Sequence, residues 1–257
     1  MAFKGKVALI TGGASGMGKV MTLRIAAMGA KVAILDNNEQ TLDETAALHP
    51  NIIPYKCDVT DLQHVKEIVT QVEHEIGPID RLAHCAAIMP AGILHEWTPE
   101  QINRVMLINY CGTVNVTQTV LSYMKVRHSG DFIVFGSIAG VVPIKRFGAY
   151  CATKAATNFY MRVLMAENTD SGIRFQLVCP SAVNTPLIAQ AIDGGPAFIK
   201  QAHATGKNMD TPEFIVDTIE KCLERNKQVN FPGIAYWGNI AYRLFPGVLS
   251  GIINRLS

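Results

Sequence analysis

Short apolar runs alternate with longer segments of helical periodicity along most of the chain. The runs predict buried strands over 7–10, 31–35, 51–57, 80–86, 131–136, 174–179 and 228–231. Apolar residues at helical spacing follow most of them, over 18–29, 62–76, 98–124, 149–168 and 211–224. This alternation predicts an α/β protein with a single Rossmann-type, doubly wound, seven-stranded parallel sheet flanked by helices. Pro54 favours an edge position for the third strand, because proline cannot donate to a ladder.

Composition excludes several classes of protein. The chain has 257 residues, of which 49% are hydrophobic and 17% charged, so it can bury a large core and is not disordered. A net charge of +2 without a basic block argues against nucleic acid as a partner. The six cysteines form no C-x-x-C pair, which argues against a metal site and a disulfide framework. No signal peptide or membrane-spanning run is evident, so we expect a soluble, cytoplasmic protein.

A glycine-rich turn joins the first strand to the first helix. Its residues are Thr11-Gly12-Gly13-Ala14-Ser15-Gly16-Met17-Gly18. Glycines let the backbone approach a pyrophosphate, and the helix that follows presents free N–H groups and a positive dipole end. A glycine pattern between a strand and a helix therefore predicts a dinucleotide-binding site.

Asp36 ends the second strand, at the distance from the glycine turn that a dinucleotide site requires. A carboxylate there can accept hydrogen bonds from both adenosine ribose hydroxyls, and it repels a 2′-phosphate. The neighbouring Asn37, Asn38 and Ser15 supply no cation to hold such a phosphate. The pattern therefore favours NAD(H) over NADP(H). A role of Asp36 as a helix N-cap is compatible with this interpretation.

Four polar residues are candidates for catalysis. Ser137 follows the fifth strand, and Tyr150 and Lys154 lie one turn apart on the next helix. A free phenol titrates near pH ~10, so a neighbouring ammonium that lowers its pKa would make an acid/base suited to an alcohol or carbonyl. Asn109 lies inside a predicted helix, where an amide needs partners. A Tyr-x-x-x-Lys pair alone is also typical of an exposed helix face, so its meaning depends on the other motifs.

Together these motifs resemble those of the classical short-chain dehydrogenases/reductases over residues 4–232. The resemblance rests on the glycine pattern, Asp36, Asp58-Val59, Asn109, Ser137, Tyr150-x-x-x-Lys154 and Pro180 to Thr185, in the family's order. It implies that Tyr150 is the catalytic acid/base and that Ser137 orients the substrate oxygen. Lys154 would lower the tyrosine pKa and bind the nicotinamide ribose. Asn109 would hold a water in a proton relay to Lys154.

The resemblance also implies the cofactor contacts. The NAD-binding residues would be Gly12, Ser15, Gly16, Met17, Gly18, Asp36, Asp58, Val59, Cys85, Ala86, Tyr150, Lys154, Pro180, Val183 and Thr185, with no metal ligand. Residues 1–232 would form the NAD-binding domain, with 185–210 as a lid over the substrate. Helices 98–124 and 149–168 would build a homodimer or homotetramer.

Two departures from the family pattern affect these expectations. The chain has His84-Cys85-Ala86-Ala87 where the family usually has Asn-Asn-Ala-Gly, which puts the contacts of those amides in question. We interpret His84 as a structural substitute, with a catalytic role as the alternative. Pro180-Ser181 replaces the usual Pro-Gly, which is a milder change.

Residues 233–257 form an apolar extension that is not an independent domain. Its only charges are Arg243 and Arg255. Three placements are open: over the substrate mouth, in an oligomer interface, or on a membrane surface as a peripheral contact. Pro246-Gly247 and Gly251 should break any long helix. An apolar lid and extension favour a lipophilic alcohol or ketone as substrate.

The sequence thus predicts an NAD(H)-dependent oxidoreductase that interconverts a secondary alcohol and a ketone, or a primary alcohol and an aldehyde. Hydride would pass to or from nicotinamide C4 while Tyr150 exchanges the hydroxyl proton. One alternative is a non-catalytic dinucleotide-binding regulator or scaffold on the same fold. A sugar-nucleotide epimerase or dehydratase is the other, but it would need a differently spaced glycine motif and a longer C-terminal domain.

Overall fold

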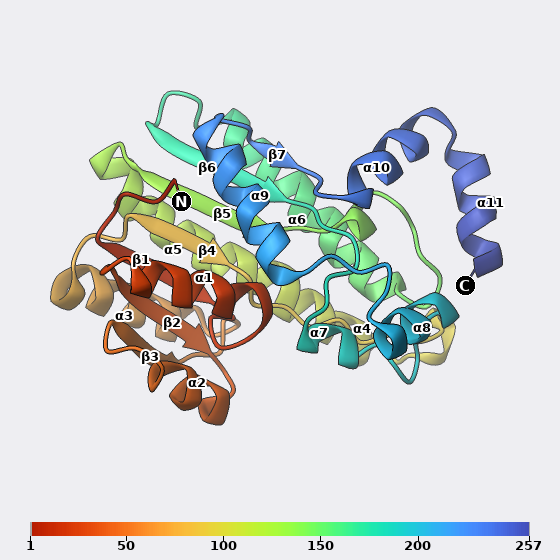
Figure 1. The fold of residues 1–257 in the computed structure, drawn as a ribbon, viewed down its shortest axis with the longest axis horizontal. Helices are drawn as coiled ribbons and strands as arrows, with labels where there is room; N and C mark the ends of the chain where they lie inside the picture. The colour runs from red at the N-terminus through yellow and green to blue at the C-terminus, as the bar shows by residue number, and fades with distance from the viewer. Residues whose placement is uncertain (1, 257) are drawn as a thin grey trace.

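A parallel sheet with helices on both faces organises the molecule (Figure 1). The computed structural model describes residues 2–256, and its sheet has the strand order β3-β2-β1-β4-β5-β6-β7 with every neighbouring pair parallel. The strands are β1 (Val7–Thr11), β2 (Lys31–Asp36), β3 (Ile52–Lys56), β4 (Arg81–His84), β5 (Gly130–Phe135), β6 (Ile173–Val178) and β7 (Val229–Asn230). The predicted fold class is confirmed, and β3 with Pro54 does lie at an edge.

The helices divide into two covering layers and a group beyond the sheet. They are α1 (Gly16–Ala27), α2 (Glu39–Ala46), α3 (Leu62–Gln71), α4 (Pro99–Met106), α5 (Gly112–Arg127), α6 (Gly148–Ala166), α7 (Pro186–Ala189), α8 (Ala197–Thr205), α9 (Pro212–Glu224), α10 (Ile234–Leu244) and α11 (Pro246–Leu256). Short π- and 3₁₀-turns are η1 (Val72–Ile76), η2 (Leu94–Glu96), η3 (Leu107–Cys111) and η4 (Ile138–Gly140). Buried residues place α1, α2 and α9 on one face, and α3, α5 and α6 on the other.

The strands β1, β2 and β5 are mainly apolar because both faces of the sheet are covered. In β1, Val7 and Leu9 pack among the helices of one face, whereas Ala8 and Ile10 pack under α1 and α9 on the other. Side chains alternate between the faces of a strand, so a strand buried on both sides has no polar alternation. This is why the continuous runs in the sequence predicted the strands well.

The strand order reverses between β1 and β4. The chain continues from β1 to β2 on one side, and from β4 to β5 on the other. Such a reversal opens a crevice beyond the carboxyl ends of the two central strands, where open α/β sheets bind their ligands. In Figure 1, α4, α7 and α8 gather beyond that end of the sheet.

Several elements differ from the sequence prediction. The helix expected over 98–124 is divided into α4, η3 and α5, and the lid segment contains α7 and α8. The extension forms two helices that meet at Pro246, as its proline suggested, but Gly251 lies inside α11 without breaking it. No helix within residues 2–256 is long and apolar enough to cross a bilayer.

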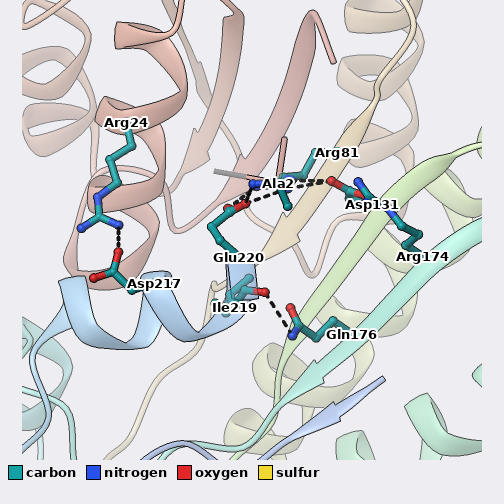
Figure 2. A network of polar contacts seen from close by, with 9 residues as sticks. All are labelled: Ala2, Arg24, Arg81, Asp131, Arg174, Gln176, Asp217, Ile219 and Glu220. Atoms are coloured by element: carbon teal, nitrogen blue, oxygen red, sulfur yellow. Dashed lines mark hydrogen bonds and ion pairs between the residues drawn. The ribbon is translucent and has the colours of Figure 1, made fainter. Parts of the chain in front are cut away.

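A buried network of ion pairs connects β4, β5 and β6 at the end of the sheet where these strands begin (Figure 2). The Arg81 guanidinium donates to Asp131 Oδ2 at 2.6 and 2.9 Å and to Glu220 Oε1 on α9 at 2.6 Å. Glu220 Oε2 also accepts from the Ala2 backbone N–H at 2.7 Å, and Arg174 Nε donates to Asp131 Oδ1 at 2.7 Å. Both carboxylates are therefore satisfied by several donors, which buried charges require.

Replacing Arg81 should destabilise the fold strongly. We expect Arg81→Met to lower the free energy of unfolding by about 3 to 5 kcal/mol, because Asp131 and Glu220 would remain buried without their shared cation. Chemical denaturation measures this change. The control is Arg24→Gln, which breaks the more exposed pair with Asp217 and should cost less than about 1 kcal/mol. Equal effects of the two variants would contradict the role of the network.

Candidate active site

The glycine turn brings the start of α1 very close to β1. A Cβ on Gly18 would lie 2.2 Å from the Gly12 carbonyl oxygen, so no larger residue fits there without moving the backbone. Gly16 has a φ of +50°, which side chains other than glycine rarely adopt. Ser15 is the N-cap residue of α1, yet within the described part of the chain its side chain makes no cap hydrogen bond. The N–H groups of this helix end are thus available to an anion.

A cavity of about 680 Å³ lies over this turn at the carboxyl edge of the sheet. It gathers most of the residues predicted to bind a cofactor: Gly12, Ser15, Gly16, Met17, Gly18, Asp36, Asp58, Val59, Cys85, Ala86 and Thr185. These residues come from five separate loops, and they meet because parallel strands end at the same edge.

Asp36 lies on the cavity wall with its carboxylate held by a local turn. Its Oδ1 accepts from the Asn38 backbone N–H at 3.1 Å. Asn38, not Asp36, is the N-cap of α2, since its side chain accepts from Thr41 N at 3.2 Å. The Asp36 carboxylate is therefore oriented by this hydrogen bond and does not serve as the N-cap of α2.

Ser137, Tyr150 and Lys154 are all buried, and Tyr150 and Lys154, which were also predicted to bind the cofactor, are not among the residues that line this cavity. Ser137 ends the β5 segment and turns into η4, where its Oγ accepts from Ala139 N at 3.1 Å. The Ser137 side chain also hydrogen-bonds that of Tyr150. Lys154, one turn further along α6, donates from Nζ to the Phe135 carbonyl at 2.7 Å. The predicted grouping of a hydroxyl, a phenol and an ammonium is present in the fold.

Burial has a larger effect on the pKa of Tyr150 in this arrangement than the neighbouring lysine. Burial raises the pKa of Tyr150, and the Ser137 hydrogen bond opposes this only in part. The Lys154 Nζ lies 5.8 Å from the centroid of the Tyr150 ring and is turned towards Phe135. Burial also lowers the pKa of Lys154, to about 8, so its charge is itself weakened in this environment.

Asn109 finds its partners in the protein. In the π-turn η3, its Oδ1 accepts from Ile88 N at 2.8 Å, and its Nδ2 donates to Ile88 O at 2.9 Å and Thr153 Oγ1 at 3.1 Å. Both amide hydrogens are thus engaged within the protein. The Asn109 side chain links the loop after β4 to α6, which carries Tyr150.

His84 bridges the two central strands and α5. Thr11 and His84 are opposite residues at the ends of β1 and β4, and Thr11 Oγ1 lies 2.8 Å from His84 Nδ1. On its other side, His84 Nε2 lies 3.0 Å from Thr113 Oγ1, which donates to the Asn109 carbonyl at 2.6 Å. Thr113 has a single proton, so it must accept from His84 Nε2–H. His84 Nδ1 then accepts from Thr11, whose oxygen accepts from Cys85 N and Ala86 N.

This chain of hydrogen bonds answers the question that the departure from Asn-Asn-Ala-Gly raised. His84 is a neutral structural bridge whose two nitrogens are both used, with a fixed tautomer. Burial lowers its pKa to about 3, and the positive charge of Lys154 contributes. The backbone amides of Cys85 and Ala86 are held at the cavity wall by Thr11.

Some site residues lie elsewhere, and others were missed. Val183 is buried in the core and bridges to Asp210, and Pro180 accepts from Ile138 N, so neither is among the cavity-lining residues given above. The cavity adds two cations, Lys19 and Arg104, and Gln190 from the lid. Sequence spacing gave no signal for Arg104 and Gln190, because they come from other elements. Lys19 lies next to Gly18 and could have been found there.

An apolar cluster surrounds Tyr150 on the side of the lid. Buried members of this cluster are Met89, Ala139, Phe147, Tyr150, Ile188, Ala191 and Ile199. Gln190, at the end of α7, accepts from Met89 N at 2.9 Å and so links α7 to the loop after β4. Tyr150 is thus surrounded by apolar side chains and shielded from bulk water.

Comparisons with known proteins agree with this fold. The family model "short chain dehydrogenase" matches residues 6–194. The fold is similar to that of a solved short-chain dehydrogenase from Streptomyces avermitilis, with a TM-score of 0.83 at 24% identity over 98% of this chain and 97% of the other. The chain belongs to the short-chain dehydrogenase family.

Two curated relatives show the range of chemistry in this family. The chain is 32% identical over 190 residues to the 2,3-dihydro-2,3-dihydroxybenzoate dehydrogenase of Bacillus subtilis, covering 72% of each protein. It is 34% identical over 194 residues to a fatty acyl-CoA reductase of Acinetobacter baylyi, covering 72% of this chain and 65% of the relative. Members of the family are oxidoreductases that use NAD or NADP on small molecules and are typically oligomeric.

The buried His84 should make the fold sensitive to acid. Its pKa is lowered on folding, so between pH 6.5 and about 3 the unfolded chain binds one proton more, and stability falls as pH falls. We expect His84→Asn, which can still bridge two hydroxyls, to lose less stability between pH 7 and 5 than the wild type, by at most about 1.4 kcal/mol per pH unit. Chemical denaturation at both pH values measures this.

The control for this experiment is His74→Asn, at an exposed histidine. We expect its pH dependence to match that of the wild type. Identical slopes for all three proteins would show that His84 does not gain a proton on unfolding.

Proposed function

We propose that this protein is an NAD(H)-dependent oxidoreductase that interconverts a lipophilic secondary alcohol and its ketone, or a primary alcohol and its aldehyde. The observation that carries the proposal is the position of the Ser137 and Tyr150 hydroxyls. Both are buried beside the apolar cluster around Tyr150, and Asn109 links the helix of Tyr150 to Ile88, which lines the cavity that also holds Asp36 and the glycine turn. Such a position suits proton exchange with a substrate oxygen at the end of a dinucleotide site.

The residues present fit a nicotinamide dinucleotide. Gly18 lets α1 pack closely on Gly12, and Gly16 lines the cavity at the N-terminus of α1, where the backbone can approach a pyrophosphate. Asp36 would accept from the adenosine ribose, and Thr185, which lines the cavity beside Gly16, would contact the nicotinamide end. When bound, the cofactor would supply or accept a hydride at nicotinamide C4.

The chain's own residues would manage the proton. Tyr150 would donate its hydroxyl proton to the carbonyl oxygen in reduction and accept it in oxidation. Ser137, already hydrogen-bonded to Tyr150, would hold the same substrate oxygen. Lys154 would contact the nicotinamide ribose and return protons to Tyr150. Asn109 would position α6 against the loop after β4 through Thr153 and Ile88.

Two observations support a lipophilic substrate. Residues 185–210, which we propose as the lid, contribute Ile188, Ala191 and Ile199 to the apolar cluster around Tyr150. Contact with this cluster would stabilise a bound apolar group by roughly 25 cal/mol for each Å² of apolar surface buried. The similarity to an acyl-CoA reductase is consistent with a long-chain substrate.

Helix α6 also offers a surface for a second copy of the chain. Phe159 and Val163 are exposed, at 71% and 41%, and lie one turn apart. Large apolar side chains exposed together on a helix are typical of an interface. This supports the proposed homodimer or homotetramer through α4, α5 and α6.

Removal of the Tyr150 hydroxyl tests the proposal directly. We expect Tyr150→Phe to lower kcat/KM about 100- to 10,000-fold, because the acid/base is lost, while NADH binding changes little. Steady-state rates on secondary alcohols of increasing chain length, with NADH fluorescence for binding, measure both. Tyr160→Phe, on the same helix, is the control and should keep its activity. A wild type that binds NADH but turns over no member of the panel would favour the regulator alternative.

Asp36 should decide between the two cofactors. We expect Asp36→Ser to bind NADH about 10- to 100-fold more weakly, because hydrogen bonds to a charged acceptor are lost, and to bind NADPH better than the wild type does. Fluorescence titration with each cofactor measures this. Asp43→Ser, an exposed position on α2 with the same change of charge, is the control. Tighter binding of NADPH by the wild type would contradict the proposal, and Lys19 and Arg104 would then be the cations to test.

A further inference from the structure

The two C-terminal helices carry an exposed apolar surface. Its members, which we call the tail surface, are Ile234, Tyr236, Trp237, Leu244, Phe245, Val248 and Ile252. Ile234, Trp237 and Leu244 are 70%, 69% and 66% exposed, although α10 is anchored on the body by its opposite side through Ala235. Figure 1 shows α10 and α11 extending away from the sheet. So much exposed apolar area on one segment marks an interaction site.

The exposed residues follow helical stripes. On α10, Ile234, Trp237 and Leu244 are spaced so that they share one face, while Ala235 and Asn239 are buried on the other side. On α11, Val248 and Ile252 are one turn apart and both exposed. Each helix therefore presents an apolar face that the body of the molecule does not cover.

The charge of this segment distinguishes between a second copy of the chain and a lipid surface as its binding partner. Residues 233–257 contain no Asp or Glu, and their two charged residues, Arg243 and Arg255, are both exposed. A twofold contact between two copies of this segment would offer neither arginine an acidic partner. An anionic lipid surface offers the opposite charge and an apolar layer beneath it. We propose that α10 and α11 dock the protein on an anionic lipid bilayer, lying in its interface.

The aromatic residues agree with this placement. Tyr236 and Trp237 stack edge to face with ring centroids 5.2 Å apart, at the start of α10. Tyrosine and tryptophan favour the headgroup region, where one end of the ring is apolar and the other is wet. Interfacial helices combine such residues with arginines on their polar side.

The tail surface adjoins the candidate active site. Helix α10 packs on η4, where a Cβ on Gly238 would lie 3.9 Å from the Ile138 side chain, and Ile138 directly follows Ser137. A docked bilayer would therefore lie close to the apolar cluster around Tyr150. This consequence rests on the proposed function; the docking itself does not.

Vesicle sedimentation of the full chain, without substrate or cofactor, tests the docking. We expect the wild type to sediment with vesicles of phosphatidylcholine and phosphatidylserine more than with phosphatidylcholine alone, and less as salt is raised. The double variant Trp237→Glu/Leu244→Glu should bind at least about tenfold more weakly. Arg243→Gln and Arg255→Gln should each weaken binding to the anionic vesicles about fivefold.

The control is Leu48→Glu, which places the same charge on an exposed leucine away from the tail and should bind like the wild type. Thermal unfolding and NADH binding confirm that each variant is folded. A wild type that sediments with neither vesicle would overturn the proposal, as would a double variant that binds like the wild type. If light scattering shows that the double variant loses subunits while the wild type ignores vesicles, the tail surface is instead a contact between copies.

Discussion

The hydrogen-bond chain through His84 is the constraint on which the crevice depends. It joins the last residues of β1 and β4, the two neighbouring strands at which the strand order reverses. From there it reaches α5 through Thr113 and ends on the Asn109 carbonyl. Each donor in this chain has one acceptor, so a fully buried polar group is satisfied at every step. The cofactor wall and the helix that carries Asn109 are therefore held in one frame.

The amino and carboxyl ends of the strands differ in how their charged groups are paired. At the edge where the strands begin, Arg81 neutralises Asp131 and Glu220 and ties α9 to the sheet. At the edge where they end, polar and charged groups are left facing a cavity rather than one another. Buried charges that are fully paired serve stability, whereas groups that keep free capacity can bind a ligand. Asp36 thus lies on the cavity wall, apart from the paired charges around Arg81.

An apolar cluster surrounds Tyr150 and includes residues of α7 and α8. Burial among Met89, Phe147 and Ile188 raises the Tyr150 pKa, so this environment by itself favours the protonated phenol. Helix α10 adjoins this cluster through η4. The proposed lipophilic substrate and the proposed membrane docking would therefore depend on neighbouring apolar surfaces.

The sequence by itself determined the elements and the chemical groups. Continuous apolar runs predicted the strands because the sheet is covered on both faces, and the glycine turn, Asp36, Ser137, Tyr150 and Lys154 were all identified from local spacing. The helix α2 and the division at η3 escaped prediction, because short or irregular helices have a weak periodic signal.

Only the tertiary structure decided how these groups meet. The roles of His84 and Asn109 depend on partners far along the chain, such as Thr11, Thr113 and Ile88, which no local pattern reveals. The pKa of Tyr150 likewise depends on burial and on where Lys154 points, and the sequence gives neither. Local spacing determines which side chains share a helix face; hydrogen bonding and desolvation are settled when separate elements pack.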